Sequence, residues 1–385
     1  MKHLFLLDPN VRFLNHGSFG ACPAEVMDTF QDWQREMERN PVEFLGRRSA
    51  GLLAVARATL AHELGARPEN LIYVPNATTG VNMVARSLKL NAGDEILTTD
   101  HEYGACDNTW RFVCQRTGAQ YVQVPIPLPF VAAEFTDRIW SAVTPRTRVI
   151  FLSHITSTTA LIFSIAELCR RARAAGILTL IDGAHVPGHI PLSLDAMGAD
   201  FYTGNCHKWL CAPKGSAFLH VQPEHHAMVD APVVSWGYSS HIAGHTGFDA
   251  YLGSTGLERR LQWQGTRDIA AFLSVPTAID FQARHGWPEV RARCHAVAVQ
   301  TLTRICALTG MDPVCTSEDF AQMVVIPVPP IDADALKTRL FDDYRIEIPV
   351  TSHGGQTFIR LSVQGYNTAD DVDALVTAVR EIFRL

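Results

Sequence analysis

The sequence predicts an α/β protein in which a large, mostly parallel sheet is followed by a smaller α+β unit. Between about residues 71 and 220, short apolar runs of strand length alternate with helical segments, the pattern of a parallel sheet. Beyond about residue 271 the expected strands are fewer and the helices longer. With 385 residues, 47% of them hydrophobic, the chain has apolar material for both cores. We therefore expect a large domain over 21–270, a small domain over 271–385, and an N-terminal segment over 1–20 that joins the small domain and the active site.

Composition and charge argue against several classes of function. The formal net charge is −6 and the basic residues form no block, so we expect no nucleic-acid partner. No apolar run approaches the roughly 18 residues of a membrane span. Asp8 and Pro9 interrupt the first apolar run too early for a signal peptide, so we expect a cytoplasmic protein with no membrane partner. The nine cysteines contain no C-x-x-C pair, and Pro187 breaks the helix that would align His185 with His189, so we expect no metal site.

The N-terminal part contains a candidate anion site. The expected elements, in order, are a turn over 15–20, a helical stretch over 24–65 broken near Asn40 and Pro41, a strand over 71–74, a turn over 75–80 and a helix over 81–88. A strand, a small polar turn and a helix together present backbone N–H groups to an anion. A helix capped by threonine is the simpler alternative for the same residues.

The middle of the chain continues the alternation of strand and helix. The expected elements are strands over 94–98, 121–124, 148–152, 177–181 and 200–203, with helices that end near Gly118 and that span 165–175. The carboxyl ends of parallel strands meet at one edge of a sheet, which is where ligands bind. Thr78, Tyr103, Ser157 and Asp182 each follow such a strand end, so we expect their side chains to lie together.

One acid and one lysine in this region point to a cofactor. Asp182 closes the strand expected over 177–181, and Lys208 follows 26 residues later, between His207 and Trp209. The aldehyde of pyridoxal 5'-phosphate (PLP) needs a lysine amine, and its pyridine nitrogen needs a carboxylate. With Lys208 nearby, the phosphate role becomes the favoured interpretation of the turn over 75–80.

The remainder of the chain is expected to form a long loop and the smaller unit. Residues 223–256 are rich in glycine, histidine and aromatic residues, and we expect them to cover a site or an interface. The later expected elements are a helix that begins within 264–268, helices over 287–308, 333–343 and 369–383, a strand over 323–327, and a strand pair over 346–350 and 358–362.

Seven short motifs are spread in order along nearly the whole chain. They are N-H-G-S-F-G (15–20), N-A-T-T-G (76–80), D-H-E-Y-G-A (100–105), I-D-G-A-H (181–185), T-G-N-C-H-K-W (203–209), G-T-R-D (265–268) and I-R-L-S with Y-N-T (359–368). Together they resemble class V aminotransferase-superfamily proteins, and most closely the isopenicillin N epimerase-like branch. The resemblance implies the PLP-dependent transferase fold type I, with a seven-stranded sheet, and a homodimer whose active site lies at the subunit interface. It is less specific for the substrate than for the fold and the cofactor.

The resemblance also implies the catalytic residues. Lys208 matches the lysine that carries the cofactor, and Asp182 matches the partner of the pyridine nitrogen. His185 stands where the family places a group near the phenolic oxygen of the cofactor. Tyr103 would stack on the ring, although His101 could align there after a shift of one or two residues.

The binding residues follow from the same motifs. The other implied cofactor-binding residues are Ala77, Thr78, Thr79, Ser157, Asn205, His207 and Thr266, the last donated by the second subunit. Many superfamily members carry asparagine where this chain has Ser157. Arg360 matches the arginine that holds the substrate carboxylate with a bidentate guanidinium. Asn15, His16 and Ser18 are implied on the substrate side of the site.

The implied function is chemistry at Cα of an amino acid or of a molecule that contains one. The substrate would form an external aldimine, and the freed Lys208 would remove the Cα proton. We expect a racemase or epimerase, with a β-eliminating C–S lyase and an aminotransferase as the alternatives. Residues 349–357 contain no cysteine ahead of Arg360, which argues against a cysteine desulfurase. The complete set of site residues argues against a non-catalytic PLP-binding protein.

Overall fold

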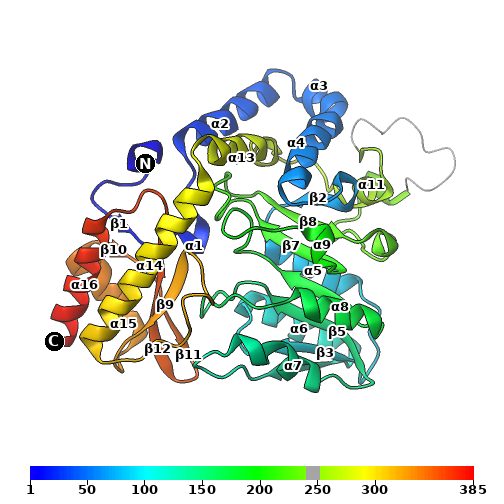
Figure 1. The fold of residues 1–385 in the computed structure, drawn as a ribbon. Helices are drawn as coiled ribbons and strands as arrows, with labels where there is room; N and C mark the ends of the chain where they lie inside the picture. The colour runs from blue at the N-terminus through cyan, green and yellow to red at the C-terminus, as the bar shows by residue number, and fades with distance from the viewer. Residues whose placement is uncertain (240–251) are drawn as a thin grey trace.

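A seven-stranded sheet is the largest feature of the computed structural model, which describes residues 1–239 and 252–385 (Figure 1). Its strands are β2 (Leu71–Val74), β3 (Glu95–Thr99), β4 (Gln120–Val124), β5 (Thr147–Ser153), β6 (Leu178–Asp182), β7 (Phe201–Asn205) and β8 (Ala217–Val221). They lie in the order β2-β8-β7-β6-β5-β3-β4, and only β8 runs antiparallel to its neighbours. The mostly parallel, seven-stranded sheet expected from the sequence is confirmed.

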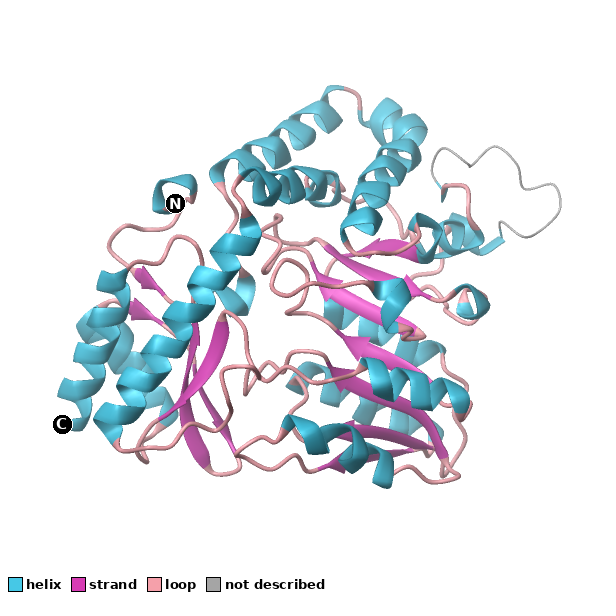
Figure 2. Cartoon of the chain, viewed as in Figure 1, coloured by secondary structure: helices cyan, strands magenta, loops and turns pink. Residues whose placement is uncertain are grey.

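Helices cover both faces of this sheet (Figure 2). They are α5 (Ala77–Ser87), α6 (Gly104–Thr117), α7 (Ala132–Ser141), α8 (Ala166–Ala174) and the short α9 (Leu194–Met197). Successive strand residues point to opposite faces, and both are buried: Ile150 packs in the same cluster as Leu168 of α8, whereas Val149 packs in the cluster of Trp110 of α6. Burial on both faces explains why the central strands are continuous apolar runs.

The second unit contains a three-stranded antiparallel sheet in the order β11-β12-β9. Its elements are α14 (Trp287–Thr309), β9 (Met323–Pro327), α15 (Ala333–Tyr344), β10 (Ile346–Glu347), β11 (Val350–His353), β12 (Gln356–Ser362) and α16 (Ala369–Phe383). The N-terminal strand β1 (Arg12–Phe13) pairs in parallel with β10, so the start of the chain is attached to this unit (Figure 1).

The other described helices come before β2 or between β8 and β9 in the sequence. The α-helices are α1 (His16–Phe19), α2 (Ala24–Arg39), α3 (Pro41–Glu43), α4 (Ser49–Glu63), α11 (Gly256–Leu261), α12 (Ala270–Leu273) and α13 (Val275–Arg284). Short 3-10 or π segments are η1 (Lys2–Leu4), η2 (Phe44–Arg48), η3 (Pro68–Asn70), η4 (Pro223–His225) and η5 (Trp236–Ser239). Among the described residues, no helix combines the length and apolar character needed to cross a bilayer.

Two helix starts differ from the sequence-based expectation. Helix α5 begins at Ala77 and not at 81, because the Asn76 side chain accepts the Thr79 N–H at 2.8 Å and caps the helix four residues earlier. Helix α12 begins at Ala270 and not within 264–268, where Gly265 has a φ of +105° that a helix does not use.

Three further elements also differ. The turn expected over 15–20 contains α1, the strand expected over 346–350 is split into β10 and β11, and α7 was not expected. The loop expected over 223–256 carries the short helices η4 and η5, and its residues 240–251 lie outside the described residues.

A buried ion pair joins α4 to α11. Arg57 pairs with Glu258, and the two side chains are only 5% and 3% exposed. Glu258 also accepts the backbone N–H of Ser254 and of Thr255. We expect Glu258→Gln to lower the free energy of unfolding by about 3–5 kcal/mol, because it leaves the Arg57 charge buried without its partner. Urea unfolding followed by circular dichroism measures this change.

Asp343→Asn is the matched control for that experiment. Asp343 pairs with Arg339 at 3.6 Å, and both side chains are about half exposed, at 55% and 47%. We expect this variant to unfold at nearly the same urea concentration as the unmodified protein. If both variants lowered the free energy of unfolding equally, the buried pair would not stabilise the fold more than an exposed one.

Candidate active site

A cavity of about 370 Å³ opens at the carboxyl ends of the central strands. Its polar lining comes from elements far apart in the sequence: Ser18, Asn76, Thr78, Tyr103, Ser153, Ser157, Asp182, His185, Asn205, His207 and Lys208. Apolar or backbone surface is added by Phe19, Pro75, Ala77, Ile155, Ala184 and Gly215. The parallel sheet therefore brings together Thr78, Tyr103, Ser157 and Asp182, as expected from their positions after strand ends.

Asp182 is the last residue of β6 and is buried. One carboxylate oxygen accepts the Ala184 N–H at 2.9 Å, and the other accepts the Cys106 S–H at 3.5 Å. Burial raises the pKa of this carboxyl above its usual value, while the Ala184 N–H and the Lys208 charge oppose the shift. No ion pair involves this carboxylate in the described part of the chain, so a cationic N–H group in the cavity would have an unused acceptor.

Lys208 lies in the loop between β7 and β8, and its amine faces His185. The Nζ–Nε2 distance is 3.1 Å. Burial, and then the charge of Arg360, lowers the pKa of Lys208 to about 7, although Asp182 acts in the opposite direction. A lysine with this pKa is largely uncharged above neutral pH, which is the form that attacks an aldehyde or accepts a proton.

The N-terminus of α5 forms one wall of the cavity. Asn76 accepts the Thr79 N–H and hydroxyl, at 2.8 and 3.0 Å, and Asn205 accepts the Ala77 N–H at 2.9 Å. No hydrogen bond within the described residues uses the N–H or the hydroxyl of Thr78. Thr78 is therefore the group of this helix terminus that is left to bind an anion.

His207 lies on the same side of the cavity. Its Nδ1 donates to the carbonyl oxygen of Ser216 at 2.9 Å, which leaves Nε2 as the second ring nitrogen. Burial lowers the pKa of His207 to about 4, so the ring is neutral in the absence of an anion. A bound phosphate would favour the charged ring and gain an N–H donor from it.

Arg360 approaches the cavity from β12 of the second unit. One terminal nitrogen donates to the Ser157 carbonyl at 2.6 Å and lies 3.3 Å from its hydroxyl, and the other donates to the Ser18 hydroxyl at 3.0 Å. The guanidinium is buried, and its Nε has no hydrogen-bond partner within the described residues. No carboxylate of the described chain neutralises this cation, so a substrate carboxylate is a chemically suitable partner.

The N-terminal segment holds these groups in place. Asn15 accepts the Ser18 hydroxyl at 2.5 Å, and His16 donates from Nε2 to the Lys208 carbonyl at 3.0 Å. Gly20, with a φ of +70°, lies so close to the backbone of His207 that a Cβ atom would collide with it. Asn15 and His16 do not line the cavity, whereas Ser18 does.

Tyr103 and His101 occupy different environments. Tyr103 lines the cavity and is 46% exposed. His101 is buried away from it: Nδ1 lies 2.7 Å from the Thr159 hydroxyl, and Nε2 donates to the Ile126 carbonyl at 2.8 Å. Tyr103 is therefore the aromatic group of this motif that is available to a ligand in the cavity.

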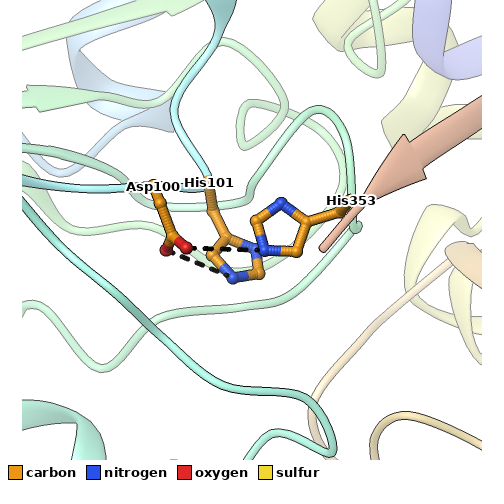
Figure 3. Close-up of side chains that lie close together, drawn as sticks. All are labelled: Asp100, His101 and His353. Carbon is orange, nitrogen blue, oxygen red and sulfur yellow. Dashed lines mark ion pairs between the residues drawn. The ribbon is translucent and has the colours of Figure 1, made fainter. Parts of the chain in front are cut away.

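His101 instead meets Asp100 and His353, which ends β11 of the second unit (Figure 3). The two imidazole rings are 3.8 Å apart, and Asp100 lies 3.6 Å from His101 and 3.7 Å from His353. Three such side chains could hold a metal ion. The Nε2 atom of His101 already carries a proton for the Ile126 carbonyl, so we interpret the cluster as a contact between the two units of the fold.

The remaining site residues expected from the sequence stand outside the cavity lining. The Thr79 hydroxyl donates to the Asn76 side chain that caps α5, and Thr266 precedes α12 without contributing to the lining. Sequence reasoning missed Ser153, which lines the cavity and donates its N–H and hydroxyl to Glu102, at 2.7 and 2.6 Å. Burial raises the pKa of Glu102 to about 8. The sequence signal for this pair was Glu102 itself, an acid next to Tyr103 in the motif D-H-E-Y-G-A.

The residues present fit PLP. A buried carboxylate with an unused acceptor, a buried amine with a low pKa and a helix N-terminus surround one cavity. These are the partners that a pyridine nitrogen, an aldehyde and a phosphate each require.

The chain is similar to known proteins over nearly its whole length. The Aminotransferase class-V family profile matches residues 15–375. Isopenicillin N epimerases of Amycolatopsis lactamdurans and Streptomyces clavuligerus are each 38% identical to this chain, covering 98% and 97% of it and 96% and 95% of their own lengths. A probable chloroplastic L-cysteine desulfhydrase of Arabidopsis thaliana is 28% identical, over 98% of this chain and 84% of its own.

Solved structures with a similar fold are more distant in sequence. A C-DES lysine variant with glycine covalently linked to the PLP cofactor has a TM-score of 0.83 at 22% identity, covering 98% of both chains. The cysteine desulfurase CsdA of Escherichia coli has a TM-score of 0.79 at 21% identity, covering 100% of this chain and 97% of its own. These likenesses confirm the fold expected from the sequence.

Proposed function

The chain belongs to the class-V aminotransferase family, in its isopenicillin N epimerase-like branch, and is a PLP-dependent enzyme; from this we propose that it inverts the configuration at Cα of an amino-acid substrate. The observation that carries the proposal is the placement of the Lys208 amine in one cavity with Asp182, beside the buried Arg360. The 38% identity with two isopenicillin N epimerases supports epimerisation among the reactions open to such a site.

Each residue has a role that follows from its environment. Bound PLP supplies an electron sink that makes the Cα proton acidic. Lys208 is the base for that proton, because its amine is uncharged above about pH 7. Arg360 holds the substrate carboxylate, which fixes the orientation of Cα relative to the amine. Asp182 would stabilise the positive charge on the pyridine nitrogen of the cofactor. Thr78 and His207 would bind its phosphate.

We also propose a homodimer that shares this site. In support, Thr266 of the G-T-R-D motif does not line the cavity of its own chain, as expected for a residue donated to a second subunit. The cytoplasm is the proposed compartment, since all nine cysteines are free and seven of them are buried.

A panel of amino acids in deuterated water tests the proposal. We expect deuterium at Cα and accumulation of the opposite enantiomer, measured by mass spectrometry and chiral chromatography. Exchange of the proton without inversion, or transfer of the amino group to a keto acid, would overturn epimerisation while leaving the cofactor role intact.

The second candidate function is β-elimination of a sulfur substituent. Its support is the 28% identity with a probable L-cysteine desulfhydrase over 98% of the chain. In the same panel, this reaction would release sulfide, pyruvate and ammonia from cysteine. No cysteine lines the cavity among the described residues, which argues against a persulfide intermediate of the desulfurase type.

The pKa of Lys208 predicts the pH dependence of turnover. We expect kcat to be constant above about pH 7 and to fall roughly tenfold per pH unit below it, because the protonated amine cannot accept the Cα proton. The fall begins near pH 7 because the pKa of Lys208 is lowered. For a lysine with an ordinary pKa, kcat would already fall below about pH 10. Initial rates with saturating substrate measure the profile, and a limb near pH 10 would contradict it.

A further inference from the structure

A hydrogen bond beside the active site determines which nitrogen of His185 carries a proton. The indole Nε1–H of Trp209 lies 3.3 Å from Nδ1 of His185, and both side chains are buried. An indole N–H only donates, so Nδ1 of His185 is the acceptor. A neutral imidazole with a bare Nδ1 carries its proton on Nε2.

The Nε2 atom of His185 is the atom that faces the reacting amine, at 3.1 Å from Nζ of Lys208. Burial, and then the charges of Lys208 and Arg360, holds the pKa of His185 well below its usual value, so the ring is neutral. The ring therefore presents an N–H to the amine, and the lone pair of Lys208 is the acceptor.

Two further histidines hold this arrangement. The ring of His189 stacks on the Trp209 indole, with centroids 3.8 Å apart and an interplanar angle of 14°. His189 accepts the Gln322 N–H at Nε2, at 2.9 Å, and so donates from Nδ1 to the His185 carbonyl, at 2.9 Å. His16 lies 4.9 Å from the indole ring. Both the ring and the backbone of His185 are thus held by groups outside the cavity.

We propose that Trp209 is a positioning residue for the reaction: its N–H orders His185 in the tautomer protonated at Nε2, so that His185 offers Lys208 a proton donor and not a base. The inference rests on the proposed role of Lys208. In this tautomer His185 directs an N–H, and no lone pair, toward the Lys208 amine. Lys208 alone is therefore the base on this side of the cavity.

The arrangement also bears on the charge of Lys208. An N–H pointing at the amine disfavours the ammonium form, in the same direction as Arg360, whereas Asp182 and Cys106 favour it. His185 in turn faces the charges of Lys208 and Arg360 and the neutral rings of His189 and His16. Without the indole N–H, His185 could direct a lone pair at Lys208 and stabilise the ammonium form.

Nitrogen-15 NMR of the holoenzyme labelled at histidine tests the tautomer directly. The His185 signals among the sixteen histidines are assigned by difference with His185→Asn. We expect Nε2 to show a one-bond coupling to hydrogen and Nδ1 to show none. A proton on Nδ1 would overturn the proposal. This readout needs no turnover, so it stays informative even if the epimerase assignment fails.

Trp209→Phe tests whether the indole is the cause. We expect the tautomer preference to weaken, and the acid limb of the kcat profile to move up by about one pH unit, with little change in KM. Trp287→Phe is the matched control, because Trp287 is buried and its Nε1 has no hydrogen-bond partner in the described chain. It should leave both readouts unchanged. An unaltered tautomer in Trp209→Phe, or an equal shift in the control, would overturn the role of Trp209.

Discussion

Replacing Lys208 with alanine should remove the visible absorbance of cofactor bound to lysine and lower kcat by a factor of roughly 10⁴, the upper end of what a general base contributes. Lys208 supplies the amine of the cavity, which is buried beside His185 and has a pKa lowered to about 7. Alanine removes both the covalent attachment and the base, and no second lysine lines the cavity among the described residues. Absorbance spectra and single-turnover rates measure the two losses separately.

Lys337→Ala is the control for this prediction. Lys337 lies exposed on α15, so its loss removes a positive charge without touching the cavity. We expect an unchanged spectrum and unchanged rates. If Lys208→Ala retained deuterium exchange at Cα near the original rate, both the base assignment and the proposed function would have to be abandoned.

Replacing Arg360 with methionine should lower kcat/KM by a factor on the order of 10²–10³, the range expected when one partner of a buried charge pair is truncated. The guanidinium is buried and has no carboxylate partner in the described chain, so a substrate carboxylate would gain the full benefit of its charge. Methionine approximates the length of the arginine stem and removes the charge. Steady-state kinetics should show the loss mainly in KM.

Arg360→Lys separates charge from geometry. Lysine keeps the positive charge but loses the fork that binds Ser157 and Ser18 together with a carboxylate. We expect kcat/KM of Arg360→Lys to lie between the values of Arg360→Met and the unmodified enzyme. Ser18→Ala removes one support of the guanidinium and should cost less than either change at Arg360. Full activity in Arg360→Met would show that the substrate carboxylate binds elsewhere.

The boundaries of elements were predicted well where capping or turn signals were local. The strand Met323–Pro327 and the helix Ala369–Phe383 match their expected bounds, because the strand is a short apolar run that ends at a proline and the helix begins at a capping box. The start of α5 was missed because a single side-chain contact from Asn76 outweighs the turn composition of 77–80. The bounds expected for the domains stay predictions.

The candidate site was partly visible in the sequence. Asp182 and Lys208 follow expected strands, so their chemistry and the parallel topology already predicted that they would meet at one edge. The contacts of Arg360 with Ser157 and Ser18 join residues that are 203 and 342 positions away from it in the sequence, and no local pattern predicts such contacts. The position of His101 was likewise decided by packing against His353.

The fold class and the cofactor could be predicted from the sequence alone, and Lys208 could be proposed as the reactive lysine, because strand ends, residue chemistry and ordered motifs are local properties. Only the tertiary structure decided the state of those groups. Burial lowers the pKa of Lys208, and the indole of Trp209, stacked on His189, orients the proton of His185 toward that amine. Desolvation and hydrogen-bond direction depend on what surrounds a side chain in three dimensions, and a linear sequence does not contain that information.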